Sequence, residues 1–120
     1  MRILFDLSGT VFGVMDMSLR PGIKDTIEAL RAKGCDVDFW TNGPRQIYAA
    51  FLERAGIKGV VFQKGADLPF KPDICIDDEP QEWMPGMVLN VSMYLSEGMQ
   101  CDVIPASIVP DESEPPSKRR

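Results

Sequence analysis

Residues 3–10 have the sequence Ile-Leu-Phe-Asp-Leu-Ser-Gly-Thr. Three consecutive apolar residues and then a carboxylate are typical of a short buried strand that ends at Asp6. Ser8, Gly9 and Thr10 follow as turn-forming residues, so the chain leaves the strand at this point. The stretch therefore predicts a strand that places a carboxylate at the edge of a sheet.

The next element along the chain is a predicted helix. Pro21 suits its first turn, because the N–H that proline lacks would have no partner there. Ile23, Ile27 and Leu30 follow at helical spacing and form one apolar face. Gly34 is placed to end the helix as its C′ residue. We therefore expect a helix that packs one face on the sheet.

Further strands and a second helix follow in alternation. The second helix is predicted to begin at Gly43-Pro44 and to end at Gly56. Its residues expected to face the sheet are Ile47, Phe51, Leu52 and Ala55. The further strands are predicted at residues 35–41, 60–62, 73–76 and 87–91. This alternation predicts the α/β class: a single three-layer Rossmann-like domain, with a mostly parallel sheet of about five strands flanked by helices.

The segments between these elements are short. Residues 11–15 mix apolar residues with glycine and predict a small hairpin flap. Neither residues 11–34 nor residues 43–70 leave room for a cap domain above the sheet. We therefore expect an open site, which suits a macromolecular or extended substrate or needs a partner as its lid.

The composition changes at Pro105. Residues 110–120 are polar, charged or proline, and such a segment is expected to be disordered in isolation. We therefore divide the chain into an α/β domain at residues 1–104 and a polar, Pro-rich C-terminal tail at residues 105–120. A protein partner is one possible way to order this tail.

Composition also limits the function. The net charge of −5 argues against nonspecific binding to nucleic acid or to an acidic membrane. The absence of histidine excludes Ser-His-Asp and Cys-His catalysis and imidazole metal sites. The three cysteines lack metal-ligand spacing and are expected to be structural thiols. No apolar run is long enough to span a membrane. We therefore expect a soluble, cytoplasmic protein.

Polar residues end three of the predicted strands. Asp6 ends the first, Thr41 ends the second, and the pair Asp77-Asp78 ends the fourth. In parallel sheets, ligands bind beyond the carboxyl ends of the strands. Turn preference explains any one of these residues, but it explains the full set poorly. The pattern predicts one polar site at that edge.

Four segments carry a resemblance to a known family. Residues 3–10 resemble the first motif of the haloacid-dehalogenase superfamily, an apolar strand followed by D-x-D-G-T. Residues 38–42 resemble its second motif, Lys71-Pro72 its third, and residues 74–82 its acidic fourth. The order of the motifs, across about residues 2–83, makes the chain similar to the small capless phosphatases of that superfamily.

The resemblance implies a Mg²⁺-dependent phosphohydrolase or phosphotransferase that forms an aspartyl phosphate on Asp6. The implied metal ligands are Asp6, Asp78 and the backbone carbonyl of Ser8, with Asp77 or Glu82 in support. The residues implied to bind phosphate are Thr10, Thr41, Asn42, Gly43 and Lys71. The implied catalytic residues are Asp6, Ser8, Thr41 and Lys71, and the implied partner is a phosphorylated small molecule or macromolecule. Lys71 is preferred over Lys64 as the lysine that orients Asp6, because Lys71-Pro72 leads into the acidic strand.

The chain departs from the family pattern at Ser8. The usual second aspartate protonates the leaving group and later activates water, and a serine hydroxyl does neither near neutral pH. The expected loss is roughly 10²–10⁴-fold in a step that needs this proton transfer. The sequence therefore predicts weakened phosphoryl chemistry, limited to good leaving groups or to phosphotransfer.

Two alternatives remain open. Ser8, the tail and the exposed-looking segment Trp83-Met84-Pro85 also fit a noncatalytic structural or interaction protein in a larger assembly. A response-regulator receiver domain has a similar set of residues, but it places the acidic pair after its first strand and the lysine last.

Overall fold

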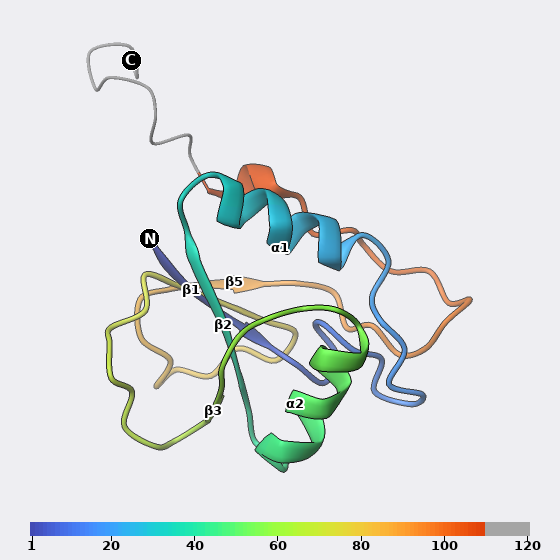
Figure 1. Ribbon diagram of the computed structural model, residues 1–120, viewed down its shortest axis with the longest axis horizontal. Coiled ribbons are helices and arrows are strands. Elements are labelled where there is room, and N and C mark those ends of the chain that lie inside the picture. Colours follow the sequence, from blue (N-terminus) through green and yellow to red (C-terminus); the bar gives the residue numbers. More distant parts are fainter. Residues whose placement is uncertain (110–120) are drawn as a thin grey trace.

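A five-stranded, all-parallel sheet forms the centre of the computed structural model, which describes residues 1–109. The strand order is β3-β2-β1-β4-β5 (Figure 1). The strands are Arg2–Asp6 (β1), Asp36–Thr41 (β2), Val61–Gln63 (β3), Ile74–Asp77 (β4) and Met87–Asn90 (β5). The helices are Ile23–Ala32 (α1), Arg45–Arg54 (α2) and a short 3₁₀ helix, Ala106–Ile108 (η1). The predicted α/β class and parallel sheet are confirmed, and each predicted strand lies within one residue of an observed one.

β1 occupies the middle of the sheet and pairs with β2 on one side and β4 on the other. A strand in this position is covered on both faces, which explains its run of apolar residues. Ile3 and Phe5 point to one face and Leu4 to the other, and all three are buried. Asp6, the next residue, lies where the strand reaches the carboxyl edge.

Both helices cover the same face of the sheet. Ile27 of α1 and Leu52 of α2 belong to the apolar cluster that contains Ile3 and Phe5. The crossovers from β1 to β2 and from β2 to β3 run in one direction, so right-handed connections put both helices on one side. Ile47 was predicted to face the sheet, but it is exposed, because the buried face of α2 centres on Leu52.

The opposite face is covered without a helix. Leu4, Trp40 and Cys75 form its buried cluster with Met84, which comes from the β4–β5 connection. Phe70, from the β3–β4 connection, packs against the same cluster. The third layer of the domain therefore consists of two loops, one between β3 and β4 and one between β4 and β5.

The predicted flap follows the first strand. Phe12 and Leu19 form an antiparallel bridge, and the Gly13 amide donates to the Ser18 carbonyl at 2.8 Å. Phe12 is buried in the core, whereas Val14 at the tip is exposed. The flap is thus anchored at its base and open at its tip.

The predicted domain boundary at residue 104 is too early. Val109 is buried in the main apolar cluster. The Lys33 ammonium at the end of α1 donates to the carbonyls of Ala106 and Val109, at 3.1 Å each. Residues 105–109 therefore belong to the domain, and the rest of the predicted tail lies outside the described residues. No helix of the described chain is long and apolar enough to cross a membrane.

Candidate functional site

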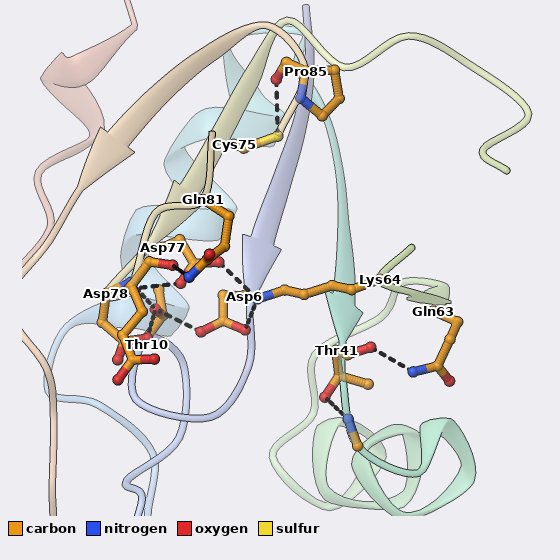
Figure 2. A network of polar contacts seen from close by, with 12 residues as sticks. Asp6, Thr10, Thr41, Gln63, Lys64, Cys75, Asp77, Asp78, Gln81 and Pro85 are labelled. Carbon is orange, nitrogen blue, oxygen red and sulfur yellow. Dashed lines mark hydrogen bonds and ion pairs between the residues drawn. The ribbon is translucent and has the colours of Figure 1, made fainter. Parts of the chain in front are cut away.

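The carboxyl edge of the sheet brings together residues that are far apart in the sequence. Strand order reverses between β1 and β4, and a crevice at such a switch point is where α/β sheets bind ligands. Asp6 ends β1, and Asp77 ends β4 with Asp78 directly after it. Lys64 follows β3 and reaches toward Asp6 from the other side (Figure 2). The predicted polar site is therefore present in the structure.

Lys64 bridges two of the carboxylates. Its ammonium lies 2.8 Å from Asp6 Oδ1 and 2.7 Å from Asp77 Oδ2. Burial alone would lower the pKa of Lys64, but the negative charges of Asp6 and Asp77 outweigh burial and raise it. Lys64 is therefore a fixed positive charge against the candidate nucleophile.

Asp6 is poorly suited to carry a full negative charge in the absence of a cation. Burial and the hydrogen bond with Asp78 raise the pKa of Asp6 from 3.8 to about 8, and the nearby charge of Asp77 adds to this rise. Lys64 opposes the shift without cancelling it. The site holds more negative charge than one lysine neutralises, so a bound cation would restore the ionised form of Asp6.

Thr10 holds the acidic groups in place. Its hydroxyl lies 3.3 Å from Asp6 Oδ2 and 3.0 Å from Asp78 Oδ1, and it accepts the Asp78 amide N–H at 3.1 Å. Thr10 is fully buried and does not line the cleft above Asp6. Thr10 was predicted to bind phosphate, but in the structure it positions the two carboxylates.

Gly9 allows Asp78 to approach this closely. A Cβ at position 9 would lie 2.6 Å from Asp78 Oδ2, and the φ of +87° is a left-handed value that favours glycine. The Ser-Gly-Thr turn therefore makes room for the second acidic strand end.

Oxygen atoms of Asp6, Asp77 and Asp78 lie within 4.8 Å of one another and could hold a metal ion. Both oxygens of Asp77 are already engaged, Oδ2 by Lys64 and Oδ1 by the Glu79 amide at 2.8 Å. Asp78 accepts from the Thr10 hydroxyl through Oδ1 and has a hydrogen bond with Asp6, so its carboxylate lies beside the candidate nucleophile, where it would share a cation with it. Asp77 therefore fits a supporting role and Asp78 a ligand role. Carboxylate oxygens are the donors that Mg²⁺ prefers.

Thr41 reaches the cleft from the end of β2. Its hydroxyl oxygen accepts the Gly43 amide N–H at 3.0 Å, which leaves the hydroxyl proton available to an anion. Its carbonyl accepts from the Gln63 side chain and the Lys64 amide, both at 2.9 Å, which couples β2 to β3. Gly43 was predicted to bind phosphate, but its amide is occupied by Thr41. Thr41 itself remains a good candidate for the phosphate contact.

These groups lie at the bottom of a cleft of about 450 Å³. Ser8 and Asn42 line it, as predicted for site residues, together with Glu79 of the β4–β5 connection. Glu82 was predicted to support the metal, but it is exposed and does not line this cleft. The apolar residues of the lining were not predicted from the sequence: Val14, Tyr48, Trp83 and Met93.

The preference for Lys71 over Lys64 is wrong. Lys71 is exposed and lines a different groove, beside Phe70. Phe70 packs against the Arg2 guanidinium, 4.6 Å from the ring centroid, at the amino end of β1. Lys71 precedes β4 and therefore lies toward the amino edge of the sheet, whereas Lys64 follows β3 at the carboxyl edge. The site was predicted from the rule that ligands bind beyond the carboxyl ends of parallel strands. Applied to the two lysines, the same rule favours Lys64, which follows β3.

Arg20 ties the Ser-Gly-Thr turn to the distal part of the chain. Arg20 is buried, and its guanidinium donates to neutral acceptors: the Ser92 carbonyl and hydroxyl at 2.8 and 2.9 Å, and the Asp102 carbonyl at 2.9 Å. Its guanidinium also lies 3.5 and 3.4 Å from the Gly9 and Thr10 carbonyls. This role was not predictable from the sequence, because most of the acceptors are backbone carbonyls that only the fold brings close to Arg20.

The strand order of the sheet differs from that of a receiver domain. Receiver domains have the order 2-1-3-4-5, whereas this chain has 3-2-1-4-5 with the acidic pair after β4. Similarity to a receiver therefore stops at the types of residue. The chain matches no family model, no curated protein and no solved structure. Its resemblance to the haloacid-dehalogenase superfamily accordingly remains a hypothesis that rests on its own residues.

Proposed function

We propose that this chain is a Mg²⁺-dependent phosphohydrolase or phosphotransferase that acts through an aspartyl phosphate on Asp6. The observation that carries the proposal is the contact of Lys64 with Asp6 at the base of a cleft, with Asp78 close by. Clustered carboxylates are unfavourable unless a cation or a reacting group compensates for them.

The donor set fits Mg²⁺. Asp6 and Asp78 would hold the ion with the Ser8 carbonyl, and Asp77 would support them through Lys64. A bound Mg²⁺ would neutralise charge on the phosphate and on Asp6. The raised pKa of Asp6 is consistent with this fit, because its carboxylate needs a positive neighbour in addition to Lys64.

Asp6 would attack the phosphorus atom with a carboxylate oxygen. The new oxygen–phosphorus bond forms as the bond to the leaving group breaks, and the leaving group departs with the electron pair. Lys64 and the Thr41 hydroxyl would stabilise the negative phosphoryl oxygens. Water, or an acceptor hydroxyl, then attacks the phosphorus atom of the aspartyl phosphate. The bond between phosphorus and the Asp6 oxygen breaks, the Asp6 carboxylate is regenerated, and the proton of the attacking group passes to solvent.

Ser8 makes both steps slower. It lines the cleft but brings no group that protonates a leaving oxygen or deprotonates water near neutral pH. The proposal therefore includes slow turnover and an aspartyl phosphate that survives long enough to be detected.

The test is incubation with Mg²⁺ and acetyl phosphate, with product release and the mass of the intact protein followed together. We expect an added phosphate or turnover that is lost in Asp6→Asn. Turnover should rise by roughly 10²-fold or more in Ser8→Asp, because the restored carboxylate can deprotonate the water that hydrolyses the aspartyl phosphate. A parent and a Ser8→Asp variant that are both inert and unphosphorylated would reject the proposal and favour the noncatalytic alternative.

A further inference from the structure

Apolar side chains line the mouth of the cleft above Asp6. Val14, Trp83 and Met93 are 45%, 51% and 41% exposed, although each is a large hydrophobic residue. They come from the flap, from the β4–β5 connection and from the chain after β5. Single exposed hydrophobic residues are ordinary, but several on one cleft indicate a binding surface.

Trp83 is held at this mouth by contact with a buried ring. Its ring packs edge-on against buried Trp40, with centroids 5.6 Å apart and an interplanar angle of 62°. The Trp40 ring centroid lies 5.8 Å from the Lys64 ammonium. The buried Trp40 ring is therefore a neighbour both of exposed Trp83 and of Lys64, the lysine that contacts Asp6.

The position of Asp6 determines where a leaving group would go. Asp6 is only 6% exposed, so it lies at the base of the cleft. In-line transfer places the leaving oxygen opposite the attacking one. A leaving group displaced by Asp6 would therefore point toward the mouth, where Trp83 and the other apolar residues lie.

The chemistry of Ser8 also restricts which leaving groups can depart. Without an acid to protonate it, the leaving oxygen must depart as an anion. A phenol has a pKa of about 10, whereas the pKa of an alkyl alcohol, which resembles water in this respect, is several units higher. An aryl oxygen therefore departs far more easily than an alkyl one.

We propose that the site takes aryl phosphate monoesters, with the aromatic ring of the leaving group against Trp83. This inference rests on the proposed function. The phosphorus–aryl oxygen bond breaks, the phenolate leaves with the electron pair, and Asp6 carries the phosphoryl group until water releases it. A free aryl phosphate and a phosphotyrosyl side chain present the same chemistry to the cleft.

The test compares four substrates with Mg²⁺ and the full chain: 2-naphthyl phosphate, O-phosphotyrosine, glycerol phosphate and acetyl phosphate. Acetyl phosphate has a good leaving group and no ring, so it separates leaving-group reactivity from ring binding. We expect kcat/KM for 2-naphthyl phosphate to exceed that for glycerol phosphate by at least about 100-fold. In Ser8→Asp this preference should shrink, because the restored acid helps the alkyl substrate most.

Trp83→Ala should lower the ratio of 2-naphthyl to acetyl phosphate kcat/KM by roughly 5-fold or more, and Trp83→Phe should keep most of it. The matched control is Val60→Ala, which removes an exposed apolar side chain (56% exposed) outside the cleft and should leave the ratio unchanged.

Equal kcat/KM for O-phosphotyrosine and a phosphotyrosyl peptide would support recognition of the ring alone, and a preference for the peptide would support a protein substrate.

Two failures can be told apart. Turnover of acetyl phosphate without a preference for aryl over alkyl phosphates, or with an unchanged ratio in Trp83→Ala, would overturn this inference alone. Absence of Mg²⁺-dependent turnover and phosphorylation with every substrate would overturn the proposed function and this inference together.

Discussion

At the scale of single residues, the site is defined by an imbalance of charge. One ammonium, that of Lys64, lies against Asp6 and Asp77, and Asp78 adds a third carboxylate to the same space. Such an arrangement does not favour the folded state by itself, because burial penalises each uncompensated carboxylate. Residues that destabilise a fold in this way are typical of functional sites, where activity requires them.

The two candidate lysines can be separated by matched substitutions. Lys64→Met should reduce phosphorylation of Asp6 at least about 100-fold, because it removes the positive charge beside the nucleophile. It should also lower the free energy of unfolding by about 3 kcal/mol, since Asp6 and Asp77 lose their common partner. Lys71→Met removes an exposed side chain and should change neither quantity by much. Intact-protein mass and urea unfolding measure both, and equal effects of the two substitutions would contradict the assignment of Lys64.

Asp6→Asn should abolish a pH dependence of stability in the metal-free protein. The pKa of Asp6 is about 8 in the folded chain against an ordinary value of 3.8. The stability that Asp6 contributes is therefore complete below pH 3.8 and is lost as the pH rises toward about 8. In EDTA, the parent should lose roughly 5 °C or more in melting temperature relative to the variant between about pH 5 and about pH 9. A difference between parent and variant that does not change with pH would show that Asp6 ionises normally in the folded protein.

At the scale of elements, the strands supply the site residues and the loops after them set their orientation. β1 ends at Asp6, but Thr10 in the following turn places the carboxylates of Asp6 and Asp78. That turn is connected through Arg20 to the chain beyond β5. The geometry of the site therefore depends on contacts well outside the motifs that contain its residues.

Arg20→Met should destabilise the fold although it keeps most of the side-chain volume. Ser92 and Asp102 would lose a charged donor in a buried region, which should lower the free energy of unfolding by about 2–4 kcal/mol. Arg20→Lys should recover part of this loss. Arg45→Met, at an exposed position in α2, is the matched control and should have little effect. Urea unfolding of the three variants measures the difference, and an Arg20→Met variant as stable as Arg45→Met would contradict the anchoring role.

At the scale of the whole molecule, the sequence predicted those features that depend on pattern and topology. The strands were predictable to within one residue, and Asp6, Thr41 and Asp77 were predictable as neighbours because parallel strands end at one edge. Trp83 was not predictable as a cleft residue, because its place depends on the path of a loop and on contact with Trp40.

The C-terminal boundary was misjudged for a similar reason. Composition becomes polar and proline-rich from Pro105, and composition alone does not show that a few apolar residues fold back on a distant helix. Val109 does so: it is 1% exposed, and its carbonyl accepts from Lys33 at the end of α1. The last described turn of chain thus completes the core on the helical face of the sheet.

Val109→Ala tests this completion of the core. Removing two buried methyl groups should lower the free energy of unfolding by roughly 1–3 kcal/mol, through lost burial and the cavity that remains. Val103→Ala makes the same chemical change six positions earlier, where the side chain is 57% exposed, and should have little effect. The two variants differ only in whether the side chain is packed, so urea unfolding of each against the parent isolates the contribution of packing. Similar stability of the two variants would show that Val109 adds little to the core. The domain boundary would then lie at residue 104, with η1 outside the domain.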